Sequence, residues 1–385
     1  MRGYKVKIYP SKRQKEILMQ NMGACRFVWN YFLALKKETY LTMGKNITYN
    51  AMSKELTKLR RETEWMKDVQ HQPMQQSLRC LDVAYNNFFR GKAKFPNFKK
   101  KNGKNSMKKV NGWSIDGNKI NVMQNMSIRF CGTFPKEREG TLTISRDPCG
   151  DWWASTIAGD KRKQPKLKNK VLGVDVGLKE LVTTSDGDKF GNLKICNSFA
   201  KKIKTASQSL AKKQKGSNRR NKVKRELARL HRKASNIRNN HLHHVSKAVV
   251  SKNHATIAME DLAVANMMKN RRLARSIGDA SWGELMRQIS YKQEWQGGNI
   301  VKVGRFFPSS KTCHSCHFVI SSLPLSVREW QCPKCLTEHD RNVNAARMIA
   351  QQAGEQLGVE STQNSSRTRP SVKVSGSSKR GYVQG

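Results

Sequence analysis

Four cysteines late in the chain have the spacing of a metal site. They form two Cys-x-x-Cys pairs with fifteen residues between the pairs: Cys313, Cys316, Cys332 and Cys335. Thiolates on two such short turns can close a tetrahedral structural zinc site. The alternative, a redox or incidental pairing, is disfavoured because the two pairs match. His314 and His317 flank the first pair and could compete as ligands, but four cysteines already complete the coordination.

Acids on apolar strands form the second candidate site. Asp175 lies in an apolar stretch, Glu260 ends another, and Asp340 begins the last helical segment. A buried lone carboxylate is costly unless it is paired or binds a metal. Carboxylates that converge from three strands or strand ends would suit Mg²⁺, and two such ions can activate a water and stabilise the leaving oxygen in phosphodiester cleavage. Taken singly, each acid is better explained as a cap or an ion-pair partner.

The overall charge indicates the class of partner. The 385 residues include 74 Lys and Arg against 28 Asp and Glu, a formal net charge of +46. Such a surface needs a polyanion to neutralise it, and we expect that polyanion to be nucleic acid. No stretch reaches about 18 consecutive apolar residues, and the first residues lack an apolar signal-peptide core. We therefore expect an intracellular protein that does not bind a membrane.

The most basic segment lies between residues 201 and 240. It holds fifteen Lys and Arg and a single acid, Glu226. So many like charges repel one another, so we interpret this helical segment as a phosphate-binding surface rather than an ordinary solvated face. The expected nucleic-acid contacts in this segment are Lys212, Lys213, Arg219, Arg220, Lys224 and Arg225. Two more are expected farther along the chain, Arg271 and Arg272. His241, His243 and His244 share only part of a helix face, so we assign them to the helix surface.

Two groups of elements must position these residues. Periodicity in the first 160 residues predicts a strand over 3–9, helices over 12–43 and 51–90 with a break at Pro73, and short strands over 112–158. This pattern indicates a β module with a helical insertion. The second group has strands at 171–178, 181–184, 256–259 and 299–303, helical segments at 200–250 and 279–296, and a last one from Asp340. The Ser- and Arg-rich composition after Gly354 predicts disorder.

Eight short motifs follow one another along the chain. Three lie near its start: Tyr9-Pro-Ser11, Cys25-Arg-Phe-Val-Trp-Asn30 and Phe95-Pro-Asn-Phe-Lys99. The other five are Val174-Asp-Val-Gly-Leu-Lys179, Met259-Glu-Asp-Leu262, Arg271-Arg-Leu-Ala-Arg-Ser-Ile-Gly-Asp-Ala-Ser-Trp-Gly283, Phe307-Pro-Ser-Ser-Lys-Thr-Cys313 and His339-Asp-Arg-Asn-Val-Asn-Ala-Ala346. Together they resemble TnpB, the insertion-sequence-encoded, RNA-guided nuclease family related to the type V CRISPR effectors. The resemblance covers residues 1 to about 352, and the set of motifs in this order is highly specific.

The resemblance implies a multidomain α/β fold. It implies a RuvC-type, RNase H-like nuclease domain at 166–305 and 339–355, with an inserted zinc ribbon at 306–338 that binds target nucleic acid. A wedge β-barrel would comprise 1–11 and 105–165, and a helical recognition domain at 12–104 would be inserted in it. The remaining residues, 356–385, would form a disordered tail.

The resemblance also implies partners and cofactors. The expected partners are a guide RNA, the omega RNA from the transposon right end, and target double-stranded DNA beside a short transposon-adjacent motif. By position, the residues that read this motif would be Tyr49, Ser53, His71, Gln72 and Gln75. Zinc would be structural and Mg²⁺ catalytic. We expect one protein on one RNA, in the bacterial cytoplasm near the nucleoid.

One departure from the family concerns the third catalytic acid. Asp175 and Glu260 match the first two acids, but the third position holds Asn342, where the family usually has Asp. An Asn carbonyl can contact Mg²⁺ but brings no charge. Asp340 could substitute if position 340 is extended, because positions two apart share a face on a strand but diverge by about 200° on a helix.

Three functions are compatible with these features. The favoured one is an RNA-guided DNA endonuclease that hydrolyses phosphodiester bonds with Mg²⁺. The second is a nuclease-inactive, RNA-guided DNA-binding repressor of the same ancestry, and the two differ in whether metal still binds. The third, a basic zinc-ribbon RNA-binding protein of ribosomal type, explains the charge and the cysteines but not Asp175 and Glu260 on apolar strands.

Overall fold

The computed structural model of the protein describes residues 1–101, 103, 105–135, 140–159 and 163–358. They fall into two units: unit 1 comprises Met1–Lys163 and Phe199–Ser235, and unit 2 comprises Gln164–Ser198 and Asn236–Gly385. None of the helices in the described ranges combines the length and apolar character that a membrane span requires. The tail predicted to be disordered after Gly354 lies outside the described residues from position 359 onward, but the last helix continues to Gln356, so the predicted start of the tail is a few residues too early.

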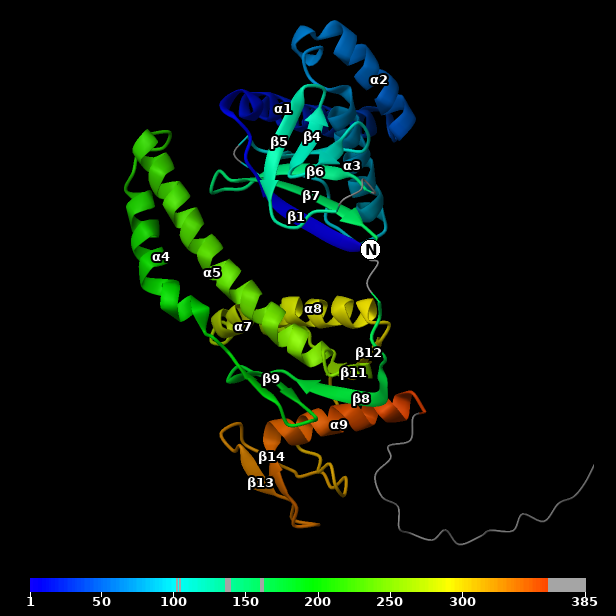
Figure 1. Cartoon of the computed structure of the whole chain (residues 1–385), viewed down its shortest axis with the longest axis vertical. Helices are drawn as coiled ribbons and strands as arrows, with labels where there is room; N and C mark the ends of the chain where they lie inside the picture. Colours follow the sequence, from blue (N-terminus) through cyan, green and yellow to red (C-terminus); the bar gives the residue numbers. More distant parts are fainter. Residues whose placement is uncertain (102, 104, 136–139, 160–162, 359–385) are drawn as a thin grey trace, which may run out of the picture. The chain divides into compact units, whose positions relative to one another are not determined.

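A seven-stranded antiparallel sheet is the centre of the N-terminal part of unit 1 (Figure 1). Its order is β2-β6-β7-β1-β5-β4-β3. The strands are β1 (Arg2–Ile8), β2 (Asn105–Lys109), β3 (Ser114–Asp116), β4 (Lys119–Met123), β5 (Met126–Cys131), β6 (Leu142–Arg146) and β7 (Trp152–Ala158). Because side chains alternate along a strand, β1 buries Val6 and Ile8 on one face, where they pack with Ile128 and Trp152. The predicted first strand is confirmed.

Three helices form a second core in unit 1. They are α1 (Lys12–Met43), α2 (Tyr49–Glu62) and α3 (His71–Phe89), with a short 3-10 helix, η1 (Glu64–Met66), between the last two. Ser11 starts α1 through reciprocal side-chain and backbone hydrogen bonds with Gln14. The predicted break at Pro73 is wrong by a few residues: Pro73 lies in the first turn of α3, where its missing N–H costs nothing. Phe32 and Leu78 are fully buried between the helices.

The basic segment predicted as one long helix is a pair of helices. These are α4 (Ile195–Ala211) and α5 (Asn218–Val250). The chain breaks at Gly216, whose φ of 88° suits glycine, and the Ser217 hydroxyl accepts a hydrogen bond from the Arg220 backbone N–H at 3.1 Å. The Arg220 guanidinium donates to the carbonyl oxygens of Leu210 and Lys213, both at 2.6 Å. One of the predicted phosphate contacts therefore holds this turn together.

A five-stranded mixed sheet is the centre of unit 2. Its order is β10-β9-β8-β11-β12, with β8, β11 and β12 parallel and β9 and β10 antiparallel. The strands are β8 (Lys168–Asp175), β9 (Glu180–Thr184), β10 (Lys189–Gly191), β11 (His254–Glu260) and β12 (Asn299–Val303). The four strands predicted for the second group of elements are confirmed as β8, β9, β11 and β12. On one face, Leu172 and Val174 pack with Val245 and Val249 of α5.

The other face of this sheet is covered by α9 (Arg341–Gln356) (Figure 1). The helix lies so close to β8 that a β-carbon on Gly173 would overlap the carbonyl oxygen of Ala346 and lie 2.8 Å from the amide nitrogen of Ala350. Farther along the same face, Val171 packs with Ile349 and Ala353. The first turn of α9 therefore lies toward the Asp175 end of β8.

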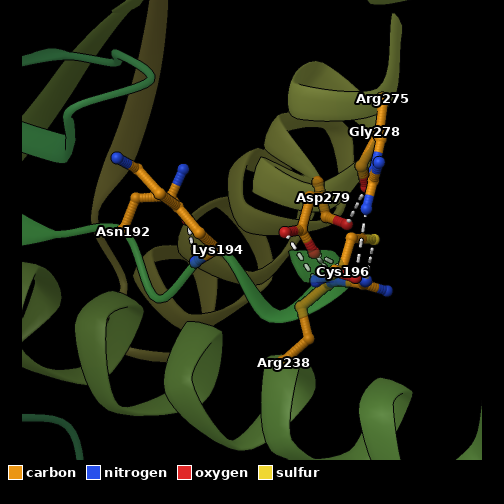
Figure 2. Close-up of polar contacts among 8 residues, drawn as sticks. Asn192, Lys194, Cys196, Arg238, Arg275, Gly278 and Asp279 are labelled. Atoms are coloured by element: carbon orange, nitrogen blue, oxygen red, sulfur yellow. Dashed lines mark hydrogen bonds and ion pairs between the residues drawn. The ribbon is translucent and has the colours of Figure 1, made fainter. Parts of the chain in front are cut away.

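Three further helices lie on the first face, and a buried carboxylate on one of them links it to α4 and α5. The three are α6 (Val264–Met267), α7 (Ala274–Ala280) and α8 (Trp282–Trp295), and the predicted helix over 279–296 is split because Ser281 has a φ of 52°. Figure 2 shows Asp279 of α7 beside Cys196 of α4 and Arg238 of α5. Asp279 accepts hydrogen bonds from the Cys196 backbone N–H at 2.9 Å and from the Arg238 guanidinium at 2.8 Å. This ion pair joins three helices within unit 2.

Candidate nuclease and metal sites

Two predicted acids end adjacent parallel strands. Asp175 is the last residue of β8 and Glu260 the last of β11, and their preceding residues, Val174 and Met259, are register partners. Because side chains alternate, Asp175 lies on the same face as Gly173, the face that α9 covers. By the same alternation along β11, Glu260 also lies on the face that α9 covers. The structure thus brings two of the three predicted acids to one edge of the sheet.

Asp175 is held in an environment that disfavours its charge. Burial, followed by the nearby charge of Glu260, raises the pKa of Asp175 to about 7. The Val176 N–H and the charge of Arg341 act in the opposite direction but do not cancel these effects. A cation placed between the two carboxylates would offset both the cost of burying the charge of Asp175 and its repulsion by Glu260. The donor set, hard oxygens with excess negative charge, fits Mg²⁺.

Ser309 orients the second acid. Its buried hydroxyl donates to Glu260 Oε1 at 2.6 Å. Ser309 belongs to the segment that leads into the first cysteine pair, so this segment contacts Glu260 directly. Ser309 lies in one of the family motifs, but its role could not be predicted from the sequence, because a serine in a loop carries no signal of its target.

The backbone at Asp340 is extended, which is the condition for Asp340 to substitute for the missing third acid. Its carboxylate oxygens, however, already accept hydrogen bonds. It ends β14 (Glu338–Asp340) and caps α9, with Oδ1 accepting from the backbone N–H groups of Asn342 and Val343 at 3.0 and 2.9 Å. Lys189 donates to Oδ2 at 2.6 Å. Burial favours the neutral acid, yet these bonds outweigh it and lower the pKa of Asp340.

Asn342 lies in the first turn of α9. Positions four apart share a helix face, so Asn342 is on the face of Ala346 and Ala350, which touch Gly173. It lies one turn closer to the helix start than Ala346, at the Asp175 end of β8. Among the described residues, its side chain makes no hydrogen bond. Position 342 is therefore placed to face the acid pair, with its amide uncommitted.

The four predicted cysteines converge. Their Sγ atoms all lie within 4.8 Å of one another, with Cys313–Cys335 at 3.6 Å and Cys316–Cys332 at 3.5 Å. Such separations fit four thiolates around one zinc ion. Within the described ranges, this is the only group of three or more His, Cys, Asp or Glu whose ligand atoms are so close. The three acids are more widely spread.

The two histidines that flank the first pair have other partners. His314 Nδ1 lies 3.2 Å from Asn344 Oδ1 and its Nε2 lies 3.0 Å from Arg347 Nη1. His317 Nε2 is 3.2 Å from Gln351 Nε2. All three contacts are to residues of α9, so each of these histidines has a partner outside the cysteine group. A third histidine, His339, which sequence reasoning missed, places Nε2 3.1 Å from Cys313 Sγ.

A buried asparagine fixes the cysteine loop to α9. Asn344 donates to the carbonyl oxygens of Thr312 at 2.7 Å and Ser309 at 3.4 Å, and accepts from the His314 backbone N–H at 3.0 Å. The hairpin of β13 (Glu329–Gln331) and β14 completes the module, with Trp330 opposite His339. Sequence reasoning gave Asn344 no role, although it lies in the motif that contains Asn342.

The residues predicted to read a DNA motif lie on α2 and α3. Tyr49 and Ser53 are in the first turns of α2, and the other three are in the first turns of α3: His71, Gln72 and Gln75. The Tyr49 hydroxyl accepts from Arg79 Nε of α3 at 3.1 Å. His71 also lines a cavity of about 490 Å³ with Thr57, Arg60, Arg61 and Lys67. Burial and the charge of Arg60 lower the pKa of His71, which keeps it neutral near pH 7.

The remaining predicted nucleic-acid contacts are mostly exposed. Lys212 and Lys213 directly follow α4, and Arg219, Lys224 and Arg225 lie in the first turns of α5; of these five, only Lys213 is half-buried. Arg271 and Arg272 are exposed in the turn before α7. His241 Nε2 contacts the Gly191 carbonyl oxygen at 2.9 Å, so that histidine packs on the helix surface as predicted.

The fold and the site define a multidomain α/β protein in which two strand-end acids are linked to a four-cysteine site. Three family descriptions match the chain: “Probable transposase” over residues 155–271, “Cas12f1-like, TNB domain” over 282–349 and “Helix-turn-helix domain” over 1–45. A Streptomyces pristinaespiralis protein provisionally named an RNA-guided DNA endonuclease is 34% identical, over 97% of this chain and 95% of its own. The chain therefore belongs to the TnpB family.

Two further relatives agree with this assignment. InsQ of Escherichia coli K12, which carries the same provisional name, is 34% identical over 91% of each chain. The fold is similar to Cas12f1 in a cryo-EM structure of its complex with sgRNA and target DNA, with a TM-score of 0.58. That match covers 88% of this chain and 83% of the other at 14% identity, so it bears on the fold alone.

Proposed function

We propose that this protein is an RNA-guided DNA endonuclease. It binds a guide RNA from the transposon end and hydrolyses double-stranded DNA next to a short transposon-adjacent motif. The observation that carries the proposal is the pair Asp175 and Glu260 at one sheet edge, where burial and mutual repulsion raise the pKa of Asp175 to about 7. Perturbed carboxylates of this kind cluster at catalytic and metal sites.

In this proposal Mg²⁺ is held by Asp175 and Glu260, with a third oxygen from position 342 or from Asp340. When bound, the metal supplies an activated water and stabilises the departing oxygen of the phosphodiester. The protein's own contribution is positional: Ser309 fixes the Glu260 carboxylate, and the N–H of Val176 favours the charged form of Asp175. Zinc on the four cysteines would hold the adjacent loop through Asn344.

The parts of the chain take the following roles. The nuclease part, of the RuvC-like RNase H type, comprises 166–305 and 339–355, and the zinc ribbon at 306–338 contacts target nucleic acid. The wedge is at 1–11 and 105–165, and helices at 12–104 form the recognition part. Base pairing with the guide reads the target, while Tyr49, Ser53 and the α3 residues read the adjacent motif. One protein acts on one RNA, near the nucleoid.

A direct test uses the complete protein co-expressed with the RNA of its transposon end. Sequencing of the bound RNA should return one structured species, and matched duplex DNA should be cut in Mg²⁺ but not in EDTA. Asp175→Ala should lose cutting and keep RNA binding, since the basic surface is untouched. Random RNA fragments in the purified protein, or undiminished cutting by Asp175→Ala, would refute the proposal.

A second candidate is guided binding without cleavage. It is favoured by one observation: Asn342 replaces the usual acid, and the oxygens of Asp340 already serve α9 and Lys189. In that case the wild-type protein protects its matched DNA from an added nuclease but never cuts it in Mg²⁺. The cleavage assay therefore separates the two candidates.

A further inference from the structure

The segment between α3 and β2 has an unusual composition. Residues 91–101, which we call the strap, contain five lysines, two phenylalanines, one proline and no acid. The strap includes the Phe95-Pro-Asn-Phe-Lys99 motif, for which the proposed function has no role. It contains no helix or strand. All of its partners described below belong to unit 1.

The strap is nevertheless fixed in place. Asn30 of α1 bonds both backbone groups of Lys99, donating to its carbonyl oxygen at 3.0 Å and accepting from its N–H at 2.8 Å. The Trp29 indole N–H donates to the Asn97 carbonyl oxygen at 3.0 Å. At the other end, the Lys92 N–H donates to the Asn87 carbonyl oxygen at 2.9 Å. Two side chains of α1 and the end of α3 thus hold an extended backbone in one conformation.

The rings of this region are left uncovered. Phe89 at the end of α3 is 70% exposed, Phe98 is 50% exposed and Phe95 is 36% exposed. A phenylalanine ring normally gains about 1.5–3 kcal/mol from full burial, and each of these rings forgoes part of this gain. They are also close together, because Phe88 contacts both Phe89 and Phe95, with ring centroids 5.3 and 5.2 Å apart. Apolar rings held together at a surface indicate a binding site.

Cations are interleaved with the rings. Lys37 Nζ lies 5.2 Å from the centroid of Phe95 and 5.1 Å from that of Phe98, and Lys99 Nζ lies 3.7 Å from the Trp29 ring. Four more strap lysines are exposed: Lys92, Lys94, Lys100 and Lys101. Rings that offer flat faces beside a row of ammonium groups match two features of a nucleic-acid strand, its bases and its phosphates.

We propose that the strap binds an unpaired stretch of nucleic acid, with bases stacked on Phe89, Phe95 and Phe98 and phosphates against the lysines. Base faces are free to stack on a protein only where they are not stacked in a duplex, so the occupant is single-stranded. The preformed backbone lowers the ordering cost of binding. The inference rests on the proposed function only in naming nucleic acid as the partner. Two sources are chemically equivalent, the guide RNA and a displaced DNA strand.

The test distinguishes base stacking on aromatic rings from contact with apolar side chains in general. In the full chain, the double variant Phe95→Leu/Phe98→Leu keeps apolar side chains, whereas Phe95→Tyr/Phe98→Tyr keeps aromatic rings. A matched control is Phe306→Leu, because Phe306 is 92% exposed but has no described ring or cation contact. The probes are 20-nucleotide RNA and DNA strands carrying 5-iodouracil, and a DNA duplex of the same length. Anisotropy measures Kd, and mass spectrometry locates the photocrosslinks.

The expected result is crosslinking to strap peptides in the wild type and about a tenfold weaker single-strand Kd for the Leu variant. The Tyr variant should regain the affinity, while duplex binding, and the slope of log Kd against log salt, should not change because no charge is removed. Stronger crosslinking of RNA than of DNA would assign the guide, and the reverse the displaced strand. A Leu variant that binds single strands like the wild type, or that loses duplex equally, would overturn the proposal. A wild type that binds no strand at all would instead contradict the proposed function.

Discussion

The hydroxyl of Ser309 donates to the carboxylate of Glu260 at 2.6 Å, which joins the segment leading into the cysteine loop to the acid pair. Hydrogen bonds to charged groups contribute about 1.5–3 kcal/mol, and this one also selects the orientation of Glu260. The relationship links the four-cysteine module to the acid pair, because the segment that leads into the module supplies a group that positions Glu260.

Ser309→Ala should therefore slow Mg²⁺-dependent cleavage by roughly tenfold, because Glu260 loses its fixed orientation. Single-turnover cleavage of matched DNA measures the effect, and zinc content measured by elemental analysis should stay at the wild-type level. The neighbouring Ser310→Ala is the matched control, since no side-chain hydrogen bond of Ser310 is found in the described part of the chain. Equal rates for both variants would show that Ser309 does not position the acid.

Gly173→Ala should destabilise unit 2 by several kcal/mol. Its β-carbon would overlap the Ala346 carbonyl oxygen, and backbone on a packed helix cannot yield cheaply. Thermal unfolding should show a clearly lower Tm. Gly191→Ala, in β10 of the same sheet, is the control because a β-carbon there has no neighbour within 4 Å. A Gly173→Ala variant with wild-type Tm would mean that α9 does not lie on β8 as described.

The sequence predicted much of this arrangement because its signals are local. Apolar stretches located β8 and β11, and the single acid on each stood out against a basic background. The Cys-x-x-Cys pairs predicted their own convergence. The contacts that hold the site escaped prediction because they are non-local: Ser309 and Asn344 are polar residues whose partners depend on how α9 packs. The sequence predicted one long basic helix, but the structure interrupts it at Gly216. There, one glycine and a serine cap outweigh a uniform helical composition.

Stability should depend on pH through Asp175. Its folded pKa is about 7 and its ordinary value 3.8, so between these values the folded protein keeps a proton that the unfolded chain releases. Asp175 therefore lowers the stability as the pH rises through this window, at about 1.4 kcal/mol per pKa unit. Asp175→Asn should raise Tm at pH 8, measured in EDTA, and change it little at pH 4.

Asp340 should affect the pH dependence of stability in the opposite direction. Its folded pKa is lowered, so its ionised form stabilises the protein above its ordinary pKa, and this stabilisation is lost as the pH falls. Asp340→Ala should lower Tm more at pH 8 than at pH 3, since it removes both the α9 cap and the Lys189 pair. If both variants changed Tm in the same direction at pH 8, the electrostatic assignment of the two acids would be wrong.

Zinc should bind at one ion per chain. Cys332→Ser replaces one of four converging thiolates, so elemental analysis should show zinc lost and target binding weakened. Cys131→Ser is the control, because Cys131 is exposed at the end of β5 and does not belong to the four-cysteine group. Full zinc content in Cys332→Ser would mean that the ligand set is misassigned.

The third metal ligand can be decided at position 342. Asn342 lies on the face of α9 that meets β8, one turn from Ala346, and an added carboxylate there would also be favoured by the helix N-terminus. Asn342→Asp should therefore raise single-turnover cleavage in Mg²⁺ by at least about tenfold with no loss of Tm. Gln356→Glu adds the same charge at the exposed end of α9 and should leave the rate unchanged. If Asn342→Asp has no effect while Asp340→Ala abolishes cleavage in a folded protein, Asp340 is the working acid and its bonds to α9 and Lys189 must exchange for the metal. If the wild type binds without cutting and Asn342→Asp cuts, the substitution at this one position is what separates a guided binder from a guided nuclease.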